Sequence, residues 1–184
     1  MGNKPPRVSS NDPVLHQPPY VFLYGVAGVG KSFCAELLAR RLGYKSYDLD
    51  QHVTPAMQAA AQEGRSFTDE MRDEFFAIVA EKMKGVMAGD PRVIFHQGAY
   101  KERHRSFLKG LFPEVCFVEV TAPLQTVSER VSRRGNWVSP EFAAVLLKNF
   151  EASQADPRLL NDGRGEEELV SCFLDAISRP QSAS

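Results

Sequence analysis

The sequence predicts an α/β fold, in which a parallel sheet of about five strands carries helices on both faces. Two observations support this prediction. Apolar runs of strand length, rich in β-branched and aromatic residues, alternate with segments whose apolar residues recur at helical spacing. A glycine-rich stretch also separates the first expected strand from the first expected helix. A length of 184 residues suits one domain with a single well-buried core.

The expected elements follow one another from residue 20 onward. Strands are expected at 20–24, 44–50, 92–96, 114–120 and 158–161. Helices are expected at 32–42, 55–63, from a cap within 66–70 to residue 87, and at 101–109, 124–134, 140–154 and 166–178. Gly43 is a stop signal for the first helix, and Pro140 is a start signal for the sixth. Because strands alternate with helices throughout, the strands should be parallel.

Composition limits the class of protein. The first 19 residues are rich in Pro, Ser, Asn and charge, so they are expected to form a disordered leader before a single domain at 20–184. The net charge of −1 argues against a nucleic-acid or membrane-surface partner, and no apolar run approaches the length of a membrane span. Cys34, Cys116 and Cys172 are widely spaced in apolar stretches, which indicates reduced, buried thiols in a cytoplasmic protein. A homodimer is left open.

The glycine-rich stretch fits the pattern G-x-x-x-x-G-K-[ST]. It consists of Gly25, Val26, Ala27, Gly28, Val29, Gly30, Lys31 and Ser32. A strand before it and a helix after it are the flanks that a P-loop requires. In such a loop the backbone amides face a phosphate, the lysine reaches the β- and γ-phosphates, and the hydroxyl ligates Mg²⁺. We therefore predict that this stretch and the adjoining Phe33 bind ATP and Mg²⁺. A glycine-rich turn that binds nothing is the alternative.

Polar residues also follow the second and third expected strands, at the edge of a parallel sheet where ligands bind. Asp48 and Asp50 close the second strand, and His96 and Gln97 follow the third. Two residues apart on an extended segment, the two carboxylates would point to opposite sides. We predict that Asp48 holds Mg²⁺ through water and that Asp50 accepts the proton of a substrate hydroxyl. Solvated acids at a strand end are the alternative.

Two groups of cations lie near the same edge. One group ends the helix at 124–134, ahead of a glycine-containing loop, and consists of Arg130, Arg133 and Arg134. These arginines either complement the helix dipole or clamp γ-phosphate oxygens during transfer. The other group lies near helix starts and consists of Arg72, Lys101 and Arg105. Each of these alone is typical of a solvated surface charge, whereas together they suit an anionic substrate.

These motifs, in this order, resemble the small P-loop kinases of the gluconate kinase and shikimate kinase type, and more closely the thermoresistant gluconate kinases. The D-G-D strand end of that family is similar to Asp48-Leu49-Asp50, and its L-[TN]-D-x-D-R segment is similar to residues 67–72. Its C-S-A-L-K-x-x-Y-R-D-x-L-R stretch is similar to residues 97–109. Its lid segments are similar to Arg134-Gly135-Asn136-Trp137 and to residues 146–151. The resemblance extends over residues 20–177.

The resemblance implies a fold like that of nucleoside monophosphate kinases, with a lid at about 133–142. It implies an ATP-dependent phosphotransferase that moves the γ-phosphoryl group to a hydroxyl of a small, anionic sugar acid, with gluconate as the first candidate. Lys31, Asp50 and Arg134 would be catalytic, and Arg130 would stack on adenine. The acid would be bound by Asp50, Arg72, Lys101 and Arg105.

The chain departs from the family on the acceptor side. Val53 stands where the family has a histidine, Met71 replaces an acid, and Asn136 replaces the lid histidine. The glycine triplet of shikimate kinases is also missing, since only Gly98 stands after the third strand. Other acceptors therefore stay open, namely shikimate, a nucleoside monophosphate or another small alcohol. A non-catalytic nucleotide-binding module is a further alternative.

Overall fold

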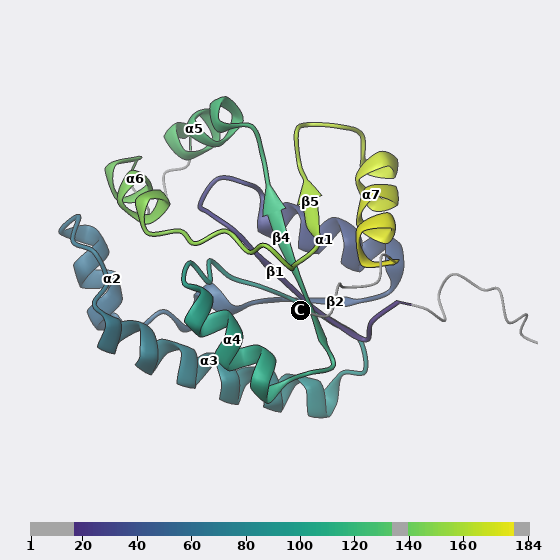
Figure 1. The fold of residues 1–184 in the computed structure, drawn as a ribbon, viewed down its shortest axis with the longest axis horizontal. Helices are drawn as coiled ribbons and strands as arrows, with labels where there is room; N and C mark the ends of the chain where they lie inside the picture. Colours follow the sequence, from purple (N-terminus) through teal and green to yellow (C-terminus); the bar gives the residue numbers. More distant parts are fainter. Residues whose placement is uncertain (1–16, 134–139, 179–184) are drawn as a thin grey trace, which may run out of the picture.

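The computed structural model describes residues 17–133 and 140–178. In this part of the chain, five parallel strands form one sheet in the order β2-β3-β1-β4-β5 (Figure 1). The strands are β1 (Tyr20–Tyr24), β2 (Lys45–Asp48), β3 (Val93–His96), β4 (Val115–Thr121) and β5 (Arg158–Leu160). β1 is central, because it pairs with β3 on one side and with β4 on the other. The predicted α/β fold with a five-stranded parallel sheet is confirmed.

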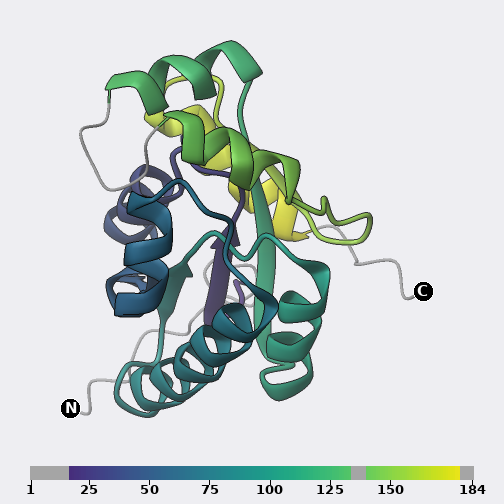
Figure 2. The same ribbon diagram turned by 90° about the vertical axis from the view of Figure 1, so that its left-hand side faces the viewer.

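Helices cover both faces of this sheet. They are α1 (Lys31–Leu42), α2 (Pro55–Gln62), α3 (Asp69–Gly89), α4 (Glu102–Leu111), α5 (Leu124–Arg133), α6 (Pro140–Lys148) and α7 (Glu166–Ser178). Figures 1 and 2 show α3 and α4 on one face and α1 and α7 on the other. α2, α5 and α6 lie around the edge where the strands end. Three helices therefore surround the edge at which a parallel sheet binds its ligands.

The core consists of two apolar layers, one on each face of the sheet. In β1, Phe22 and Tyr24 belong to the layer under α3 and α4, whereas Val21 and Leu23 belong to the layer under α1 and α7. This alternation follows from the two-residue period of a strand. Because both faces are covered, every position of the strand is apolar, and this explains the continuous apolar runs in the sequence.

Local signals in the sequence mark one end of each of two helices, as predicted. Gly43 adopts a left-handed conformation (φ +74°) after α1, and its N–H donates to the carbonyl of Ala39. Thr68 caps α3 by accepting the N–H of Met71. Glycine tolerates positive φ at a helix end, and a threonine oxygen satisfies an otherwise unpaired amide of the first turn. These caps depend on neighbouring residues alone, which is why the sequence predicts them.

The second strand ends earlier than predicted. β2 stops at Asp48, and residues Leu49–His52 form a 3₁₀ helix. The Asp48 side chain caps that turn by accepting the N–H of Asp50 at 2.9 Å. The prediction that both carboxylates lie on one extended segment is therefore wrong. An aspartate side chain that bonds the backbone two residues later competes with strand pairing and favours a turn.

The sixth helix also ends earlier than predicted, at Lys148 instead of residue 154. The Asn149 side chain donates to the carbonyl of Val145 at 2.8 Å and so satisfies one of the last carbonyls of the helix. The N–H of Glu151 donates to the carbonyl of Tyr100 at 2.8 Å. This bond draws the chain away from the helix axis and onto the residues that follow β3.

Near the amino end, the folded part begins before β1. The carbonyl of Pro18 accepts the Tyr44 hydroxyl at 2.7 Å, and the carbonyl of Pro19 accepts the N–H of Val93 at 3.0 Å. The last residues of the expected leader therefore pack on the domain, while residues 1–16 lie outside the described residues. Cys34 is buried, and Cys116 and Cys172 are half-buried free thiols. Over the described ranges, no helix combines the length and the apolar character that spanning a membrane requires.

Candidate active site

The phosphate loop connects β1 to α1 and depends on its glycines. Gly28 and Gly30 have φ angles of +89° and +90°, which side chains rarely adopt. A Cβ on Gly30 would lie 2.3 Å from Nδ2 of Asn161, and a Cβ on Gly28 would lie 2.9 Å from the carbonyl oxygen of Val127. The loop is thus packed closely against α5 and the residue that follows β5, with no space for a methyl group at either glycine.

Three side chains hold the loop in this shape. Nζ of Lys31 donates to the carbonyls of Gly25 and Val26, at 3.1 Å in both cases. The carbonyl of Val29 accepts Nδ2 of Asn161 at 2.8 Å and Nη1 of Arg130 at 3.2 Å. Two cations therefore lie against the backbone of the loop, one from α1 and one from α5, and their positive charge favours an anion at the loop.

Sequence reasoning missed the contribution of Asn161. Its side chain is buried, and its backbone N–H donates to the carbonyl of Thr121 at 2.8 Å, which extends the pairing of β4 and β5. The only signal in the sequence is that it is the last, polar residue of an expected strand. Its contact with the loop joins residues far apart in the chain.

A pocket opens between the phosphate loop and the ends of β2 and β3. Its polar lining consists of Lys31, Ser32, Asp50, Arg72, Gln97 and Tyr100. Its apolar lining includes Phe67, Phe75, Phe76 and Met57, which come from α2, α3 and the residues before α3. The structure thus brings seven predicted site residues into one cavity, namely Ala27, Gly28, Gly30, Lys31, Ser32, Asp50 and Arg72.

Asp50 is the carboxylate of this pocket. Nε2 of Gln97 donates to its Oδ1 at 3.2 Å. Burial raises the pKa of the Asp50 carboxyl above its ordinary range, while the ammonium of Lys31 and the bond from Gln97 act in the opposite direction. A carboxylate whose pKa is raised is a stronger base, so this environment suits proton abstraction.

Asp48 does not line the pocket. Its side chain is half exposed, it caps the 3₁₀ turn, and its Oδ1 lies 3.6 Å from Nδ1 of His96. Burial lowers the pKa of the His96 imidazole, so this ring is neutral near pH 7 and makes no ion pair there. The geometry gives Asp48 a role in shaping the turn that presents Asp50.

Arg72 is a buried cation that lines the pocket. Only 5% of its surface is exposed, and its guanidinium lies over the ring of Phe67, 5.5 Å from the centroid. Among residues 17–133 and 140–178, no carboxylate forms an ion pair with it. The carboxylates of Asp69 and Glu151 act on this guanidinium only from beyond ion-pair distance, and burial lowers its pKa. Burying a charge without a close partner is costly, so an arginine in this position favours an anionic ligand in the pocket.

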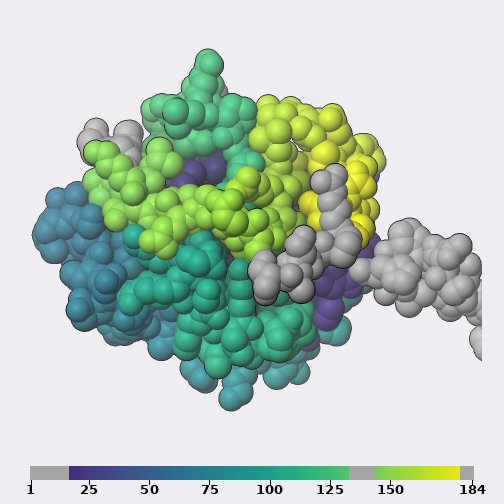
Figure 3. Space-filling view, in the orientation of Figure 1, coloured from purple at the N-terminus to yellow at the C-terminus, as the bar shows by residue number. Residues whose placement is uncertain are grey.

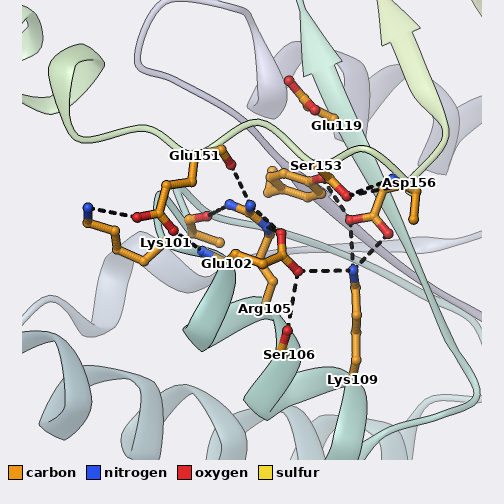
Figure 4. Close-up of polar contacts among 12 residues, drawn as sticks. Lys101, Glu102, Arg105, Ser106, Lys109, Glu119, Glu151, Ser153 and Asp156 are labelled. Atoms are coloured by element: carbon orange, nitrogen blue, oxygen red, sulfur yellow. Dashed lines mark hydrogen bonds and ion pairs between the residues drawn. The ribbon is translucent and has the colours of Figure 1, made fainter. Parts of the chain in front are cut away.

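The other two cations predicted to bind substrate lie outside this lining. Arg105 is fully buried, and it donates to the carbonyl of Ala99 at 2.6 Å, to a carboxylate oxygen of Glu102 at 3.1 Å and to the carbonyl of Glu151 (Figure 4). Lys101 donates to Glu151 at 3.0 Å. Both residues join α4 to the segment that follows α6. Arg105 is therefore not placed to bind a substrate. It lies outside the lining of the pocket, and its charge is already neutralised by Glu102, three residues earlier in α4.

The remaining predicted site residues are less informative. Phe33 is 48% exposed and does not line the pocket. Arg134, Asn136 and Trp137, with most of the expected lid, lie outside the described residues.

On the side of the loop that faces α5 and α6 there is a second, largely apolar hollow. Its lining includes Val26, Val127, Val131, Ala143 and Leu147, and Figure 3 shows the first part of the chain (purple) at its bottom.

Comparisons with known proteins cover this site. The model of a family described as an AAA domain matches residues 21–155, a range that includes the phosphate loop, Asp50 and Arg72. The shikimate kinase of Streptomyces coelicolor is 30% identical over 172 residues, which cover 86% of this chain and 95% of that protein. The gluconokinase of Gluconobacter oxydans is 25% identical over 141 residues, which cover 76% of this chain and 79% of that protein. Among solved structures, a sugar kinase from Janibacter sp. HTCC2649 has a TM-score of 0.75 at 25% identity and covers 90% of this chain and 98% of its own.

Proposed function

We propose that this chain phosphorylates a small hydroxy acid. The chain belongs to the AAA domain family and is a P-loop small-molecule kinase of the gluconokinase and shikimate kinase group. The observation that supports this acceptor is the buried Arg72, which lines the same pocket as Lys31 and Asp50 without an ion pair among the described residues. A carboxylate on the acceptor would supply a negative charge within ion-pair distance of Arg72.

The phosphate loop would bind the triphosphate of ATP. The amides that follow Ala27 and the start of α1 would face the phosphates, and Lys31 would move from the two loop carbonyls that it now contacts to the β- and γ-phosphates. Arg130 lies beside the loop and would contact the nucleotide from α5. We assign Arg134 to the lid and to the transferring phosphoryl group, as the resemblance implies.

The residues of the pocket fit Mg²⁺. Ser32 and Asp50 present oxygen atoms, which this hard cation prefers, and both line the pocket beside the loop. Ser32 would hold the ion. Asp48 lies outside the lining, so we assign it no direct contact. When bound, Mg²⁺ would neutralise charge on the β- and γ-phosphate oxygens.

The acceptor would react at the Asp50 side of the pocket. Its hydroxyl oxygen attacks the γ-phosphorus, the bond from that phosphorus to the bridging oxygen breaks, and ADP leaves. The hydroxyl proton passes to the Asp50 carboxylate, whose Oδ1 is oriented by Gln97. Arg72 would hold the acid group, so that the protein contributes mainly position and charge.

Two acids are the first candidates. Gluconate is the candidate that the resemblance of residues 48–50, 67–72 and 97–109 to gluconate kinases implies. The apolar lining favours shikimate as the second candidate, because the phenylalanine rings suit the carbon face of a ring. The several hydroxyls of an open-chain sugar acid would each need a polar partner once buried, and Ser32, Gln97 and Tyr100 are the uncharged polar side chains of the lining.

The test is a panel of acids with Mg-ATP. We expect gluconate, shikimate or a related hydroxy acid to accelerate ADP release in a saturable manner. Arg72→Met should raise the KM for that acid about 10- to 100-fold, as expected for the loss of a charged hydrogen bond, while leaving the Kd for ATP unchanged. Arg103→Met is the matched control, because Arg103 is exposed and pairs with Asp73 at 2.8 Å.

Two results would contradict the proposed activity, and a third would contradict the role of Arg72. If ATP binds but no acid accelerates ADP release, the chain is a nucleotide-binding module. If a nucleoside monophosphate is phosphorylated faster than every acid, the acceptor class is wrong. Equal effects of the Arg72 and Arg103 substitutions on the KM would remove Arg72 from the acid site.

A further inference from the structure

The turn after β3 holds a residue in an unusual backbone conformation. Ala99 has a φ of +39°, which among the described residues makes it the one non-glycine residue with positive φ. The N–H of Ala99 donates to the side-chain oxygen of Gln97, and its carbonyl accepts Nη1 of Arg105 at 2.6 Å. Backbone strain that is held by several side chains is typical of functional sites. The residue that this turn presents is Tyr100.

Tyr100 is fixed from several directions. Its ring lines the pocket and packs edge-on against Phe150, with centroids 5.9 Å apart and planes at 87°. Its carbonyl accepts the N–H of Glu151 at 2.8 Å. A Cβ on Gly98 would lie 2.4 Å from Cε2 of the ring, so a glycine two residues before Tyr100 is needed for the ring to lie where it does. The side chain therefore has little freedom to turn away from the pocket.

The hydroxyl of Tyr100 lies between the phosphate loop and the acceptor side of the pocket. Its oxygen accepts the N–H of Ala27 at 3.1 Å. The N–H of Gly25 also donates to the carbonyl of Gly98, at 3.4 Å, so the loop and the strained turn are joined twice. Within the described part of the chain, no group accepts the hydrogen of the Tyr100 hydroxyl. The geometry thus leaves this hydrogen available for a further acceptor.

The charge state of Tyr100 suits a donor. Burial raises the pKa of the phenol well above its ordinary range, and the nearby carboxylate of Asp50 acts in the same direction. The hydroxyl therefore keeps its proton at neutral pH and acts neither as an anion nor as a base. A buried phenol that already accepts one hydrogen bond gains most from an acceptor for its own proton.

We propose that Tyr100 is a specificity-determining residue of the acceptor pocket, whose hydroxyl donates to an oxygen of the acceptor while its own oxygen keeps the Ala27 amide in place. This inference rests on the proposed kinase function. It assigns a substrate class, namely hydroxy acids that carry a second oxygen within reach of Tyr100, in addition to the hydroxyl that reacts at Asp50. The same contact joins acceptor binding to the shape of the phosphate loop.

The experiment compares Tyr100→Phe with Tyr44→Phe. The first change removes the hydroxyl and keeps the ring. Tyr44 is a matched control, because it is similarly buried and its hydroxyl donates to the carbonyl of Pro18, outside the pocket. The probe is gluconate or shikimate, whichever the wild-type protein phosphorylates faster. The KM for the acid is measured from the rate of ADP release. The Kd for the acid and the Kd for ATP are measured by calorimetry.

We expect Tyr100→Phe to raise the KM and the Kd for the acid about 3- to 10-fold. The Kd for ATP should rise by a smaller factor, because the Ala27 amide loses its acceptor while the other contacts of the phosphate loop remain. Tyr44→Phe should change none of these values. Gly98→Ala tests the same contact without deleting it, since the added methyl group would push the ring aside, and it should raise the KM for the acid as well. This second variant answers the question if Tyr100→Phe fails to fold.

Each contrary result has its own meaning. An unchanged Kd and KM for the acid in folded Tyr100→Phe would overturn the role of Tyr100 and leave the kinase function intact. Weaker ATP binding with unchanged acid binding would mean that the hydroxyl only supports the loop, which also overturns the inference. A wild-type protein that phosphorylates no acid would overturn the proposed function, and the role of Tyr100 with it.

Discussion

The substitution Gly30→Ala tests the close packing of the phosphate loop. At φ +90° an alanine is strained, at a cost of about 1–2 kcal/mol. Its Cβ would also lie 2.3 Å from Nδ2 of Asn161, so that side chain must move away. Moving it breaks the 2.8 Å bond to the carbonyl of Val29, which keeps its bond from Arg130, and leaves the buried Asn161 amide without this acceptor, which costs about 1–3 kcal/mol more. We expect a total loss of about 2–5 kcal/mol in the free energy of unfolding.

The chain offers a control for the strain alone. Gly163 has a φ of +95°, and no atom lies within 4 Å of the Cβ that an alanine would add there. Gly163→Ala should therefore cost only about 1–2 kcal/mol. In a background of Asn161→Ala, where the side chain that clashes is gone, Gly30→Ala should cost no more than this control.

Urea denaturation at 25 °C measures these differences, because the midpoint shifts while the slope stays constant when only stability changes. Calorimetry with ATP gives a second measurement, in which Gly30→Ala should weaken binding and Gly163→Ala should not. Equal losses of stability for the two alanine variants would refute the close contact between Gly30 and Asn161. So would a full loss for Gly30→Ala in the Asn161→Ala background.

Three further predictions concern the pocket and its support. Asp50→Asn should lower kcat by about 10²- to 10⁴-fold with the Kd for ATP nearly unchanged, as expected for loss of a general base. Because burial raises the pKa of Asp50, the acid limb of wild-type kcat/KM should lie above the ordinary aspartate range and should vanish in the variant; a limb near pH 4 would contradict this. Arg105→Met should lower the free energy of unfolding, measured by urea denaturation, by about 3 kcal/mol, because buried carbonyls such as that of Ala99 lose their donor. A loss below about 1 kcal/mol would mean that the surrounding side chains repack and would contradict this prediction. Burial lowers the pKa of His96 and His104, so the folded state binds fewer protons than the unfolded chain as the pH falls below about 6.5, and the free energy of unfolding should decline there. This decline is best measured in the Asp50→Asn variant, which lacks the opposing titration of Asp50. A free energy of unfolding that stays constant between about pH 7 and 5 in that variant would contradict the prediction.

The fold and the phosphate loop could be predicted from sequence because their determinants are local. Both faces of β1 are buried, so its residues form one apolar run. The caps at Gly43 and Thr68 act on residues of their own helices. The phosphate loop is a contiguous motif, and its glycines are required by backbone angles that the motif itself sets.

The parts that sequence did not predict depend on contacts between distant residues. Asn161 meets the loop only after β5 pairs with β4, and Tyr100 meets Ala27 only after β3 pairs with β1. Arg105 looked like a substrate ligand because its burial against Tyr24, on a neighbouring strand, cannot be read from its own helix. Side-chain satisfaction in the interior depends on the whole fold, whereas the sequence shows only neighbours.

Binding of the nucleotide is the central claim of this account. Calorimetry with ATP and with ADP at millimolar magnesium measures it directly, and Lys31→Ala is the matched variant. We expect saturable binding of both nucleotides to the wild-type protein and much weaker binding to the variant, because the ammonium that we propose as the contact of the phosphates is removed. Absence of any heat of binding for ATP and ADP with the folded wild-type protein would contradict the account.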